Sequence, residues 1–103
     1  MDTFYVLAEP RRRKILELLA INGQLTSGEI SKKFNITAQA ISQHLNVLLE
    51  AKVVLMKKKA QKHIYFINTS KVVEVEEWAK KIETQWNSRL DNLEKLLQKE
   101  NTK

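Results

Sequence analysis

The side chains with the clearest chemistry lie at residues 37–49 of this 103-residue chain, where the residue pattern predicts a helix. Gln39, Ser42 and Gln43 share one side of that helix. They carry no formal charge, and amide and hydroxyl groups of this kind pair with base edges in the major groove of DNA. An ordinary solvated helix face more often carries Glu and Lys. The pattern therefore predicts a surface that contacts base edges.

The opposite side of the same helix indicates how it is held in place. Ile41, Leu45 and Leu48 recur at i, i+4 and i+7, which is the spacing of a helix face that packs into a core. Thr37 is placed to cap the first turn of the helix. Packing of the apolar face would leave the polar side chains in solvent.

A second helix is predicted just before this one. Thr26 and Glu29 have the spacing of a capping box, at the start of a helix that carries Ile30 and Phe34 at i and i+4. Residues 35–36 form the predicted turn. Two short helices joined by a tight connection make a helix-turn-helix.

Two further helices are predicted near the N-terminus. Residues 4–8 form a short helix that stops before Pro10, because the residue before a proline disfavours the helical conformation. Proline suits the first position of the next helix, which Gly23 ends. Arg11, Arg12 and Arg13 open this second helix, where the helix dipole disfavours positive charge. Either an external anion or a salt bridge would explain these three arginines.

After Lys52 the pattern becomes extended. Residues 53–59 and 62–67 predict two strands of a hairpin around residues 60–61. Five lysines and no acidic residue lie between positions 52 and 62, so the tip is basic. A basic hairpin directly after a recognition helix is called a wing. On strand parity, we expect His63 to pack partly against the wing.

The C-terminal third predicts one long helix at residues 70–99. Its apolar residues follow spacings of three and four: Val75, Trp78, Ile82, Trp86, Leu90, Leu93 and Leu97. At about 1.5 Å per residue this helix is roughly 45 Å long, too long for a small domain to cover. A helix from a second copy is the simplest cover.

Composition limits the classes of function. The net charge is +6, and residues 1–69 hold 11 basic and 5 acidic side chains whereas residues 70–103 hold 7 of each. The excess positive charge therefore accompanies the predicted recognition helix and favours a polyanionic partner. The absence of cysteine excludes disulfides and thiolate metal sites. No segment has the length of a membrane span, and no catalytic or phosphate-binding motif is evident, so we expect a soluble, cytoplasmic protein that is not an enzyme.

Residues 4–67 together resemble the ArsR-type winged-helix repressors. Residues 7–20 (LAEPRRRKILELLA), 25–36 (LTSGEISKKFNI) and 41–54 (ISQHLNVLLEAKVV) are similar to three blocks of the family. The matching positions include Arg12, Ser42, His44, Leu45, Leu48 and Tyr65. The resemblance implies the fold, dimerisation and DNA binding.

The chain also departs from that family. Lys52 and Ala60 stand where the family usually has glycine, so the turn of the wing is expected to be longer or differently shaped. Gln43 takes an often basic position. The cysteine metal motif and the paired Asp and His residues of the alternative metal site are absent. The resemblance therefore does not carry over metal sensing, no metal or cofactor is expected, and an effector is unknown.

We predict a mainly α fold with a small β-hairpin, namely a winged helix-turn-helix at residues 1–69 and a dimerisation helix at residues 70–103. The predicted function is that of a homodimeric transcriptional repressor that reads an inverted repeat in double-stranded DNA. The alternative is a winged-helix module that binds another protein or RNA. The predicted DNA contacts are Thr37, Ala38, Gln39, Ser42, Gln43, His44, Lys58, Lys59 and Lys62. The predicted dimer contacts are Phe4, Trp78, Ile82, Trp86, Leu90 and Leu93.

Overall fold

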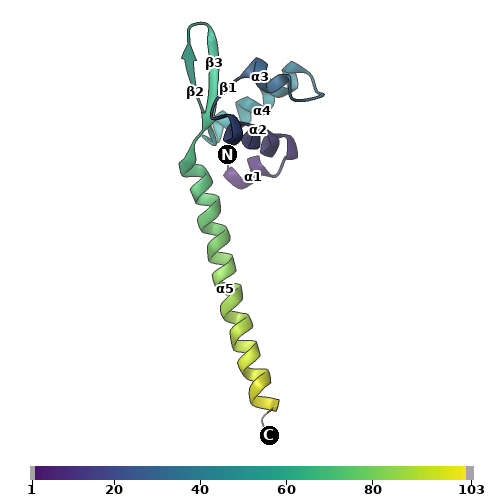
Figure 1. The fold of residues 1–103 in the computed structure, drawn as a ribbon, viewed down its shortest axis with the longest axis vertical. Coiled ribbons are helices and arrows are strands. Elements are labelled where there is room, and N and C mark those ends of the chain that lie inside the picture. The colour runs from purple at the N-terminus through teal and green to yellow at the C-terminus, as the bar shows by residue number, and fades with distance from the viewer. Residues whose placement is uncertain (1, 102–103) are drawn as a thin grey trace. The chain divides into compact units, whose positions relative to one another are not determined.

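The computed structural model describes residues 2–101 (Figure 1). Five helices and three strands follow in the order α1 (Thr3–Leu7), α2 (Pro10–Asn22), β1 (Leu25–Thr26), α3 (Ser27–Ser31), α4 (Ala38–Glu50), β2 (Val54–Lys59), β3 (Lys62–Ile67) and α5 (Thr69–Asn101). The strands form one antiparallel sheet in the order β1-β3-β2. The predicted fold class, a mainly helical winged helix-turn-helix with a long C-terminal helix, is confirmed.

The chain separates into two compact units, with the boundary between Val72 and Val73. The first unit contains every element up to the beginning of α5. The second unit is the remainder of α5.

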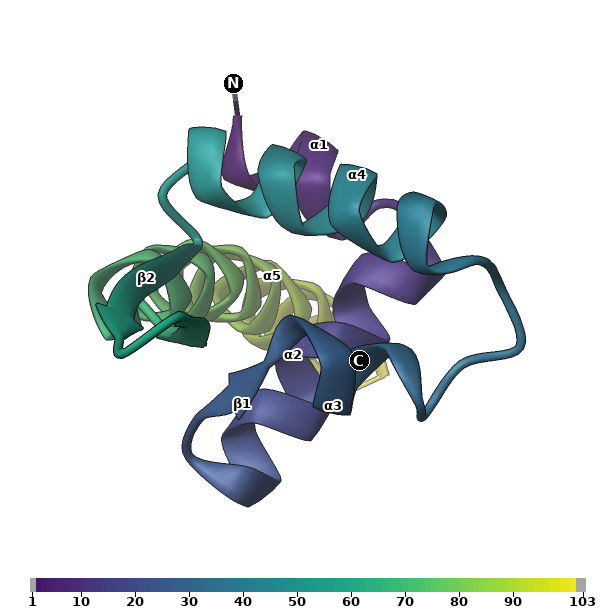
Figure 2. The same cartoon turned by 90° about the horizontal axis from the view of Figure 1, so that it is seen from above.

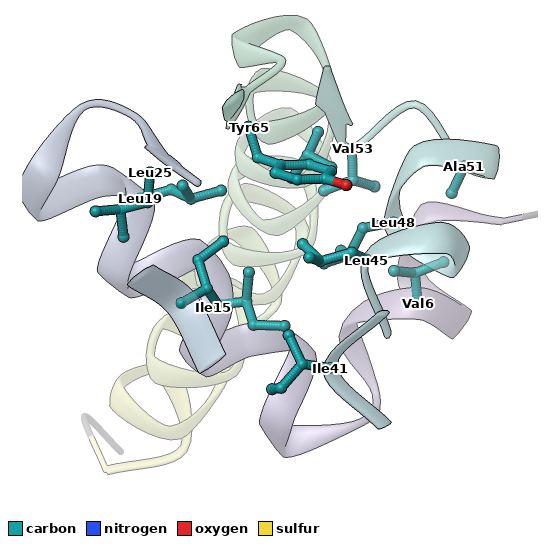
Figure 3. Close-up of a cluster of buried hydrophobic side chains, with 12 residues drawn as sticks. Val6, Ile15, Leu19, Leu25, Ile41, Leu45, Leu48, Ala51, Val53 and Tyr65 are labelled. Carbon is teal, nitrogen blue, oxygen red and sulfur yellow. The ribbon is translucent and has the colours of Figure 1, made fainter. Parts of the chain in front are cut away.

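The core of the first unit is built on the apolar faces that the helix periodicity predicts. Ile15 of α2 and Ile41 and Leu45 of α4 are almost fully buried and point into the same space (Figure 3). In addition, α3 contacts α4. Helix α1 also contacts α2, into which it leads (Figure 2). Burying each of these side chains contributes about 1.5–3 kcal/mol relative to leaving it in water.

Two of the three arginines at the start of α2 stabilise the end of α1. The Nε of Arg12 donates to the carbonyl of Val6 at 2.7 Å, and Nη1 of Arg13 donates to the carbonyls of Leu7 at 2.7 Å and Ala8 at 3.1 Å. The last carbonyls of a helix have no partner within it, so these guanidinium groups satisfy them. Arg11 forms an ion pair instead, with its Nη1 at 3.9 Å from Oε1 of Glu9.

The connection between α3 and α4 is longer than the predicted two-residue turn. Because α3 ends at Ser31, the connection spans residues 32–37 and includes the partly buried Phe34. The backbone N–H of Lys33 bonds to the carbonyl of Ile30, and that of Phe34 bonds to Ser31. These i to i−3 bonds tighten the chain as it leaves the helix.

Strand β1 was not among the predicted elements. Leu25 pairs with Tyr65, and Thr26 pairs with Ile64, which joins the start of the helix-turn-helix to the returning strand of the wing. A strand of two residues has no periodicity of its own. The strand is recognised only by its pairing with β3, in which Leu25 lies opposite Tyr65, 40 positions later.

The wing keeps a two-residue turn, since Lys59 pairs with Lys62 across Ala60 and Gln61. Ala60 has φ +58° and Lys52 has φ +60°. Both residues, which stand where the family usually has glycine, therefore adopt the left-handed conformation. The wing turn is therefore not lengthened.

The prediction for His63 was wrong, because its side chain is exposed. It pairs with Lys58, one residue before the pair that closes the turn of the hairpin. Strand parity places His63 on the same face as Tyr65 and Ile67. Along β3, however, burial ends at Ile64, and residues 62 and 63 are exposed.

Candidate nucleic-acid interface

The N-terminal half of α4 presents the predicted recognition surface. Thr37 has extended backbone angles, and its Oγ1 accepts a hydrogen bond from the N–H of Ala40 at 3.1 Å. This cap fixes where the helix starts, and burial of Ile41, Leu45 and Leu48 fixes its rotation. All the side chains at the start of the opposite face are exposed, namely Thr37, Ala38, Gln39, Ser42 and Gln43.

His44 differs from the other predicted DNA contacts because it is half-buried. It lies close enough to Glu9 to influence that carboxylate. Loss of solvent raises the pKa of Glu9, but hydrogen bonds from the N–H groups of Arg12 and Arg11 outweigh this, and the charges of His44 and Arg11 add to them. The pKa of Glu9 is therefore below its ordinary value. His44 is therefore within electrostatic range of the residue that caps α2, and α2 and α4 contact each other.

Glu9 itself is a helix cap that the sequence analysis did not identify. Its Oε2 accepts from the N–H of Arg11 at 2.7 Å and from that of Arg12 at 3.2 Å. Glutamate is not among the preferred capping residues, although a carboxylate at a helix N-terminus is favoured by the dipole. The sequence signal that could have identified this cap is Pro10, because a proline at the first position of a helix makes the preceding residue the cap.

The wing carries the second group of predicted contacts. Lys58, Lys59 and Lys62 are exposed around the turn. Lys57 differs because its Nζ lies 5.8 Å from the centre of the Phe66 ring, a cation–π contact. The lysines at the tip are therefore better placed than Lys57 to reach an external anion.

A polar pocket lies between the wing and the start of α3. It has a volume of about 340 Å³ and is lined by Thr26, Ser27, Gly28, Gln61, Lys62 and His63. Glu29 belongs to the same region of α3 as this pocket. Hydrogen bonds from the backbone and side chain of Thr26 lower the pKa of the Glu29 carboxyl, and the positive charges of Lys62 and Lys32 lower it further. The pairing of β1 with β3 creates this pocket, so the sequence alone did not indicate it.

One polar side chain ties the recognition helix and the wing to the start of α5. Asn68 Nδ2 donates to the carbonyl of Lys52 at 2.8 Å, and its backbone N–H donates to the carbonyl of Val53 at 3.0 Å. Its Oδ1 accepts from the hydroxyl of Ser70 at 2.9 Å. The left-handed turn at Lys52 is thus held by a residue 16 positions later.

The predicted dimer contacts fall in both units. Phe4 is half-buried in α1. The α5 residues are exposed, with Trp78 at 52%, Trp86 at 61% and Leu93 at 53% of their maximal accessible area, and Ile82 and Leu90 similar. Their role in dimerisation stays a prediction.

The described part of the chain contains neither a cluster of candidate metal ligands nor a helix that could cross a membrane. Within residues 2–101, no group of three or more His, Cys, Asp or Glu side chains is arranged to hold a metal ion. Among the described helices, none combines the length and the apolar character needed to span a membrane.

Comparison with known proteins identifies the family. Residues 9–54 match the model of the bacterial regulatory proteins of the arsR family. The chain is 39% identical over 77 residues to the transcriptional repressor SdpR of Bacillus subtilis, covering 75% of this chain and 84% of SdpR.

Solved structures agree with this assignment. The crystal structure of an ArsR family transcriptional regulator superposes with a TM-score of 0.75 at 26% identity, covering 84% of this chain and 88% of that one. The homodimeric winged helix-turn-helix DNA-binding domain of Mb0332 from Mycobacterium bovis shares the fold, with a TM-score of 0.64 at 22% identity over 81% of this chain and 76% of that one. The family resemblance seen in the sequence is confirmed, and the chain belongs to the ArsR family of winged helix-turn-helix transcriptional regulators.

Proposed function

We propose that this ArsR-family regulator is a homodimeric repressor that binds an inverted repeat in double-stranded DNA. In this proposal each α4 enters a major groove, with Gln39, Ser42 and Gln43 at base edges. The observation that carries it is the exposed, uncharged face at the start of α4, opposite a fully buried apolar face. Similarity to SdpR, a transcriptional repressor, supports the direction of regulation.

Around this recognition surface, other groups would bind the DNA backbone. Lys58, Lys59 and Lys62 reach flanking phosphates or the minor groove, while Thr37, Ala38 and His44 complete the contacts of α4. Phosphate contacts position the protein and base contacts select the sequence. The excess of basic residues in residues 1–69 supports this division.

Dimerisation would come from the long helix, with Phe4 of α1 contributing. The exposed apolar side chains of α5 form a surface that needs a cover in water. Residues 1–69 would then be the DNA-binding domain and residues 70–103 the dimerisation helix. The Mb0332 domain, which has the same fold, is homodimeric, and this supports the same assembly here.

The regulator would act in the cytoplasm, without catalysis and without cysteine-based sensing. Transcriptional regulators of this family are not enzymes, and the chain has no cysteine. Arsenite therefore lacks the thiolate ligands that it would need, and zinc lacks both the cysteine motif and the paired Asp and His residues of the family's two kinds of metal site.

Selection of bound duplexes from a random pool tests the proposal. We expect an enriched palindrome with half-site centres about 10–11 base pairs apart, one helical turn, and at least one A·T pair per half-site opposite a glutamine. Enrichment of no sequence, with retention of a protein or RNA ligand instead, would contradict the proposal and favour an interaction module.

A further inference from the structure

Helix α4 ends in a tight turn that contains a residue in a disfavoured conformation. The N–H of Lys52 donates to the carbonyl of Leu49, and the N–H of Val53 donates to the carbonyl of Leu48, both at 3.0 Å. Such a pair of bonds is the Schellman motif, which has a residue with positive φ just after the helix. Glycine is the usual residue there because it has no Cβ, but here Lys52 occupies the position with φ +60°. A backbone of this kind persists only where its surroundings fix it.

Asn68 supplies contacts that fix this turn. Its Nδ2 donates to the carbonyl of Lys52 at 2.8 Å, and its backbone N–H donates to the carbonyl of Val53 at 3.0 Å. Two successive carbonyls that follow the recognition helix thus accept hydrogen bonds from one residue. Loss of the side-chain donor would remove one of these two bonds and loosen the turn.

Asn68 also leads into α5. It is the one residue between the end of β3 and the start of α5. Its Oδ1 accepts from the hydroxyl of Ser70 at 2.9 Å, and its carbonyl accepts from the N–H of Lys71 at 3.1 Å. Because Oδ1 is engaged by Ser70, the NH2 end of the amide is directed to the carbonyl of Lys52. The side chain therefore joins the end of α4 to the first turn of α5.

Both ends of the Asn68 amide are used, and an aspartate of the same shape does not reproduce them. Asparagine carries an acceptor oxygen and an NH2 donor, whereas an ionised carboxylate only accepts. A carboxylate at this position would still accept from Ser70 but would place a negative charge against the carbonyl of Lys52. The link between α4 and α5 therefore needs the amide.

We propose that Asn68 is a positioning residue that sets which separation of DNA half-sites the protein accepts. This inference rests on the proposed homodimer, in which α4 contacts the bases and α5 carries the dimer contacts. The hydrogen bonds of Asn68 connect the end of α4 to the start of α5. While they hold the turn in one conformation, the two α4 helices of a dimer have one favoured separation. When the turn is released, each α4 can adjust, and other separations are accepted.

A purely stabilising role for Asn68 has a different consequence. Loss of a hydrogen bond that only stabilises the fold lowers the fraction of binding-competent protein, so the affinity for every duplex falls by the same factor. Loss of a positioning residue changes the ratio of affinities between duplexes whose half-sites are separated differently. This ratio therefore distinguishes the two roles.

Asn68→Asp removes the donor to Lys52 and keeps the start of α5, because aspartate caps helices as well as asparagine does. Dissociation constants are measured on duplexes that carry the selected half-sites at the selected spacing and at spacings one base pair shorter and longer. One base pair changes the separation of the half-sites by about 3.4 Å and their relative rotation by about 35°. We expect this variant to lose about twofold to tenfold of the preference for the selected spacing, which corresponds to one hydrogen bond. Affinity for a duplex with a single half-site should not change.

Asn22→Asp is the matched control. The Nδ2 of Asn22 donates to the carbonyl of Leu18 at 2.8 Å, so the same kind of donor is lost, but at the end of α2. This bond joins α2 to neither α4 nor α5. The control variant should therefore keep the spacing preference of the unmodified protein.

Ser70→Ala is a second test variant. It removes the bond that orients the amide of Asn68 and adds no charge. It should reduce the spacing preference in the same direction as Asn68→Asp, by a smaller factor. Far-UV circular dichroism identifies the variants that are folded, and if Asn68→Asp does not fold, an unchanged preference in Ser70→Ala would overturn the inference.

The outcomes separate this inference from the proposed function. A folded Asn68→Asp protein that keeps the full spacing preference, or that loses affinity equally on all duplexes, would overturn the positioning role and leave the repressor proposal intact. An equal loss of preference in Asn22→Asp would also overturn it, because general destabilisation would then explain the effect. An unmodified protein that prefers no spacing would refute the inverted-repeat proposal, and this inference with it.

Discussion

Replacement of Ala60 by glycine should stabilise the protein, although the same substitution in a helix destabilises it. Ala60 is exposed at the wing turn with φ +58°. This left-handed conformation costs a residue with a Cβ about 1–2 kcal/mol. Glycine removes that cost, but its greater freedom in the unfolded chain costs about 0.5–1 kcal/mol. The net expectation is a stabilisation of about 0.5–1 kcal/mol.

Ala20 provides the matched control. It is exposed inside α2, so Ala20→Gly removes the same methyl group from a helical backbone and should cost about 1 kcal/mol. The two variants should therefore differ by about 1.5–2 kcal/mol in opposite directions.

Urea unfolding followed by far-UV circular dichroism measures both changes. The two tryptophans lie in α5, so their fluorescence does not report directly on the wing. All proteins are compared at one concentration, because dimerisation would shift the apparent stability. Equal destabilisation by both substitutions would refute the left-handed turn at Ala60, and no change on Ala60→Gly would mean that the wing tip unfolds independently of the core.

Other predictions concern DNA, assembly and pH. Gln43→Ala should weaken binding to the selected operator by about 1–3 kcal/mol and relax selection at one base pair without weakening nonspecific binding; equal loss on random DNA would refute the base contact. Lys59→Ala should weaken binding to all sequences alike and reduce the salt dependence by about one charge in a titration of affinity against salt. Trp86→Glu should convert the dimer to a folded monomer in sedimentation, and a dimer that survives the substitution would place the interface elsewhere. Hydrogen bonds from Thr26 lower the folded-state pKa of Glu29 below 4.5, so its contribution to stability is present above the unfolded pKa and is lost as the pH falls through the folded value. Glu29→Gln should consequently show a smaller loss of urea midpoint between about pH 7 and pH 3 than the unmodified protein, and an equal loss would contradict the capping role. Zinc and arsenite should leave operator affinity unchanged, which calorimetry with metal and a DNA-release assay can check.

Local patterns accounted for most of the elements. The i, i+4, i+7 spacing in α4 identified its buried face, because a helix returns to the same side every 3.6 residues. The capping box at Thr26 and Glu29 marked the start of α3, and both of its hydrogen bonds are formed. For the interface, the sequence identified a set of side chains that the fold leaves exposed on α4 and the wing. Their contacts with DNA stay predictions.

Residues whose partners are distant in the sequence were not predicted. Arg12 and Arg13 were attributed to an anion or a salt bridge, but they bond to carbonyls at the end of α1. Their role depends on the angle between two helices, which no local pattern specifies. The positive φ of Lys52 was likewise not predicted, because lysine itself gives no sign of a left-handed turn; the glycine that the family usually has at this position was the available signal.

Local sequence patterns are sufficient to predict the order of the helices and of the two wing strands, the apolar faces that α2 and α4 bury, and the surplus of positive charge in the first two thirds of the chain. These properties follow from local propensity and periodicity, which act over a few residues. Three features depend on the folded chain as a whole: the pairing of β1 with β3, the pocket that His63 and Lys62 share with Ser27, and the bond from Asn68 that holds the turn at Lys52. Such contacts join segments that lie 16 to 40 positions apart, and they form only when the buried faces pack together.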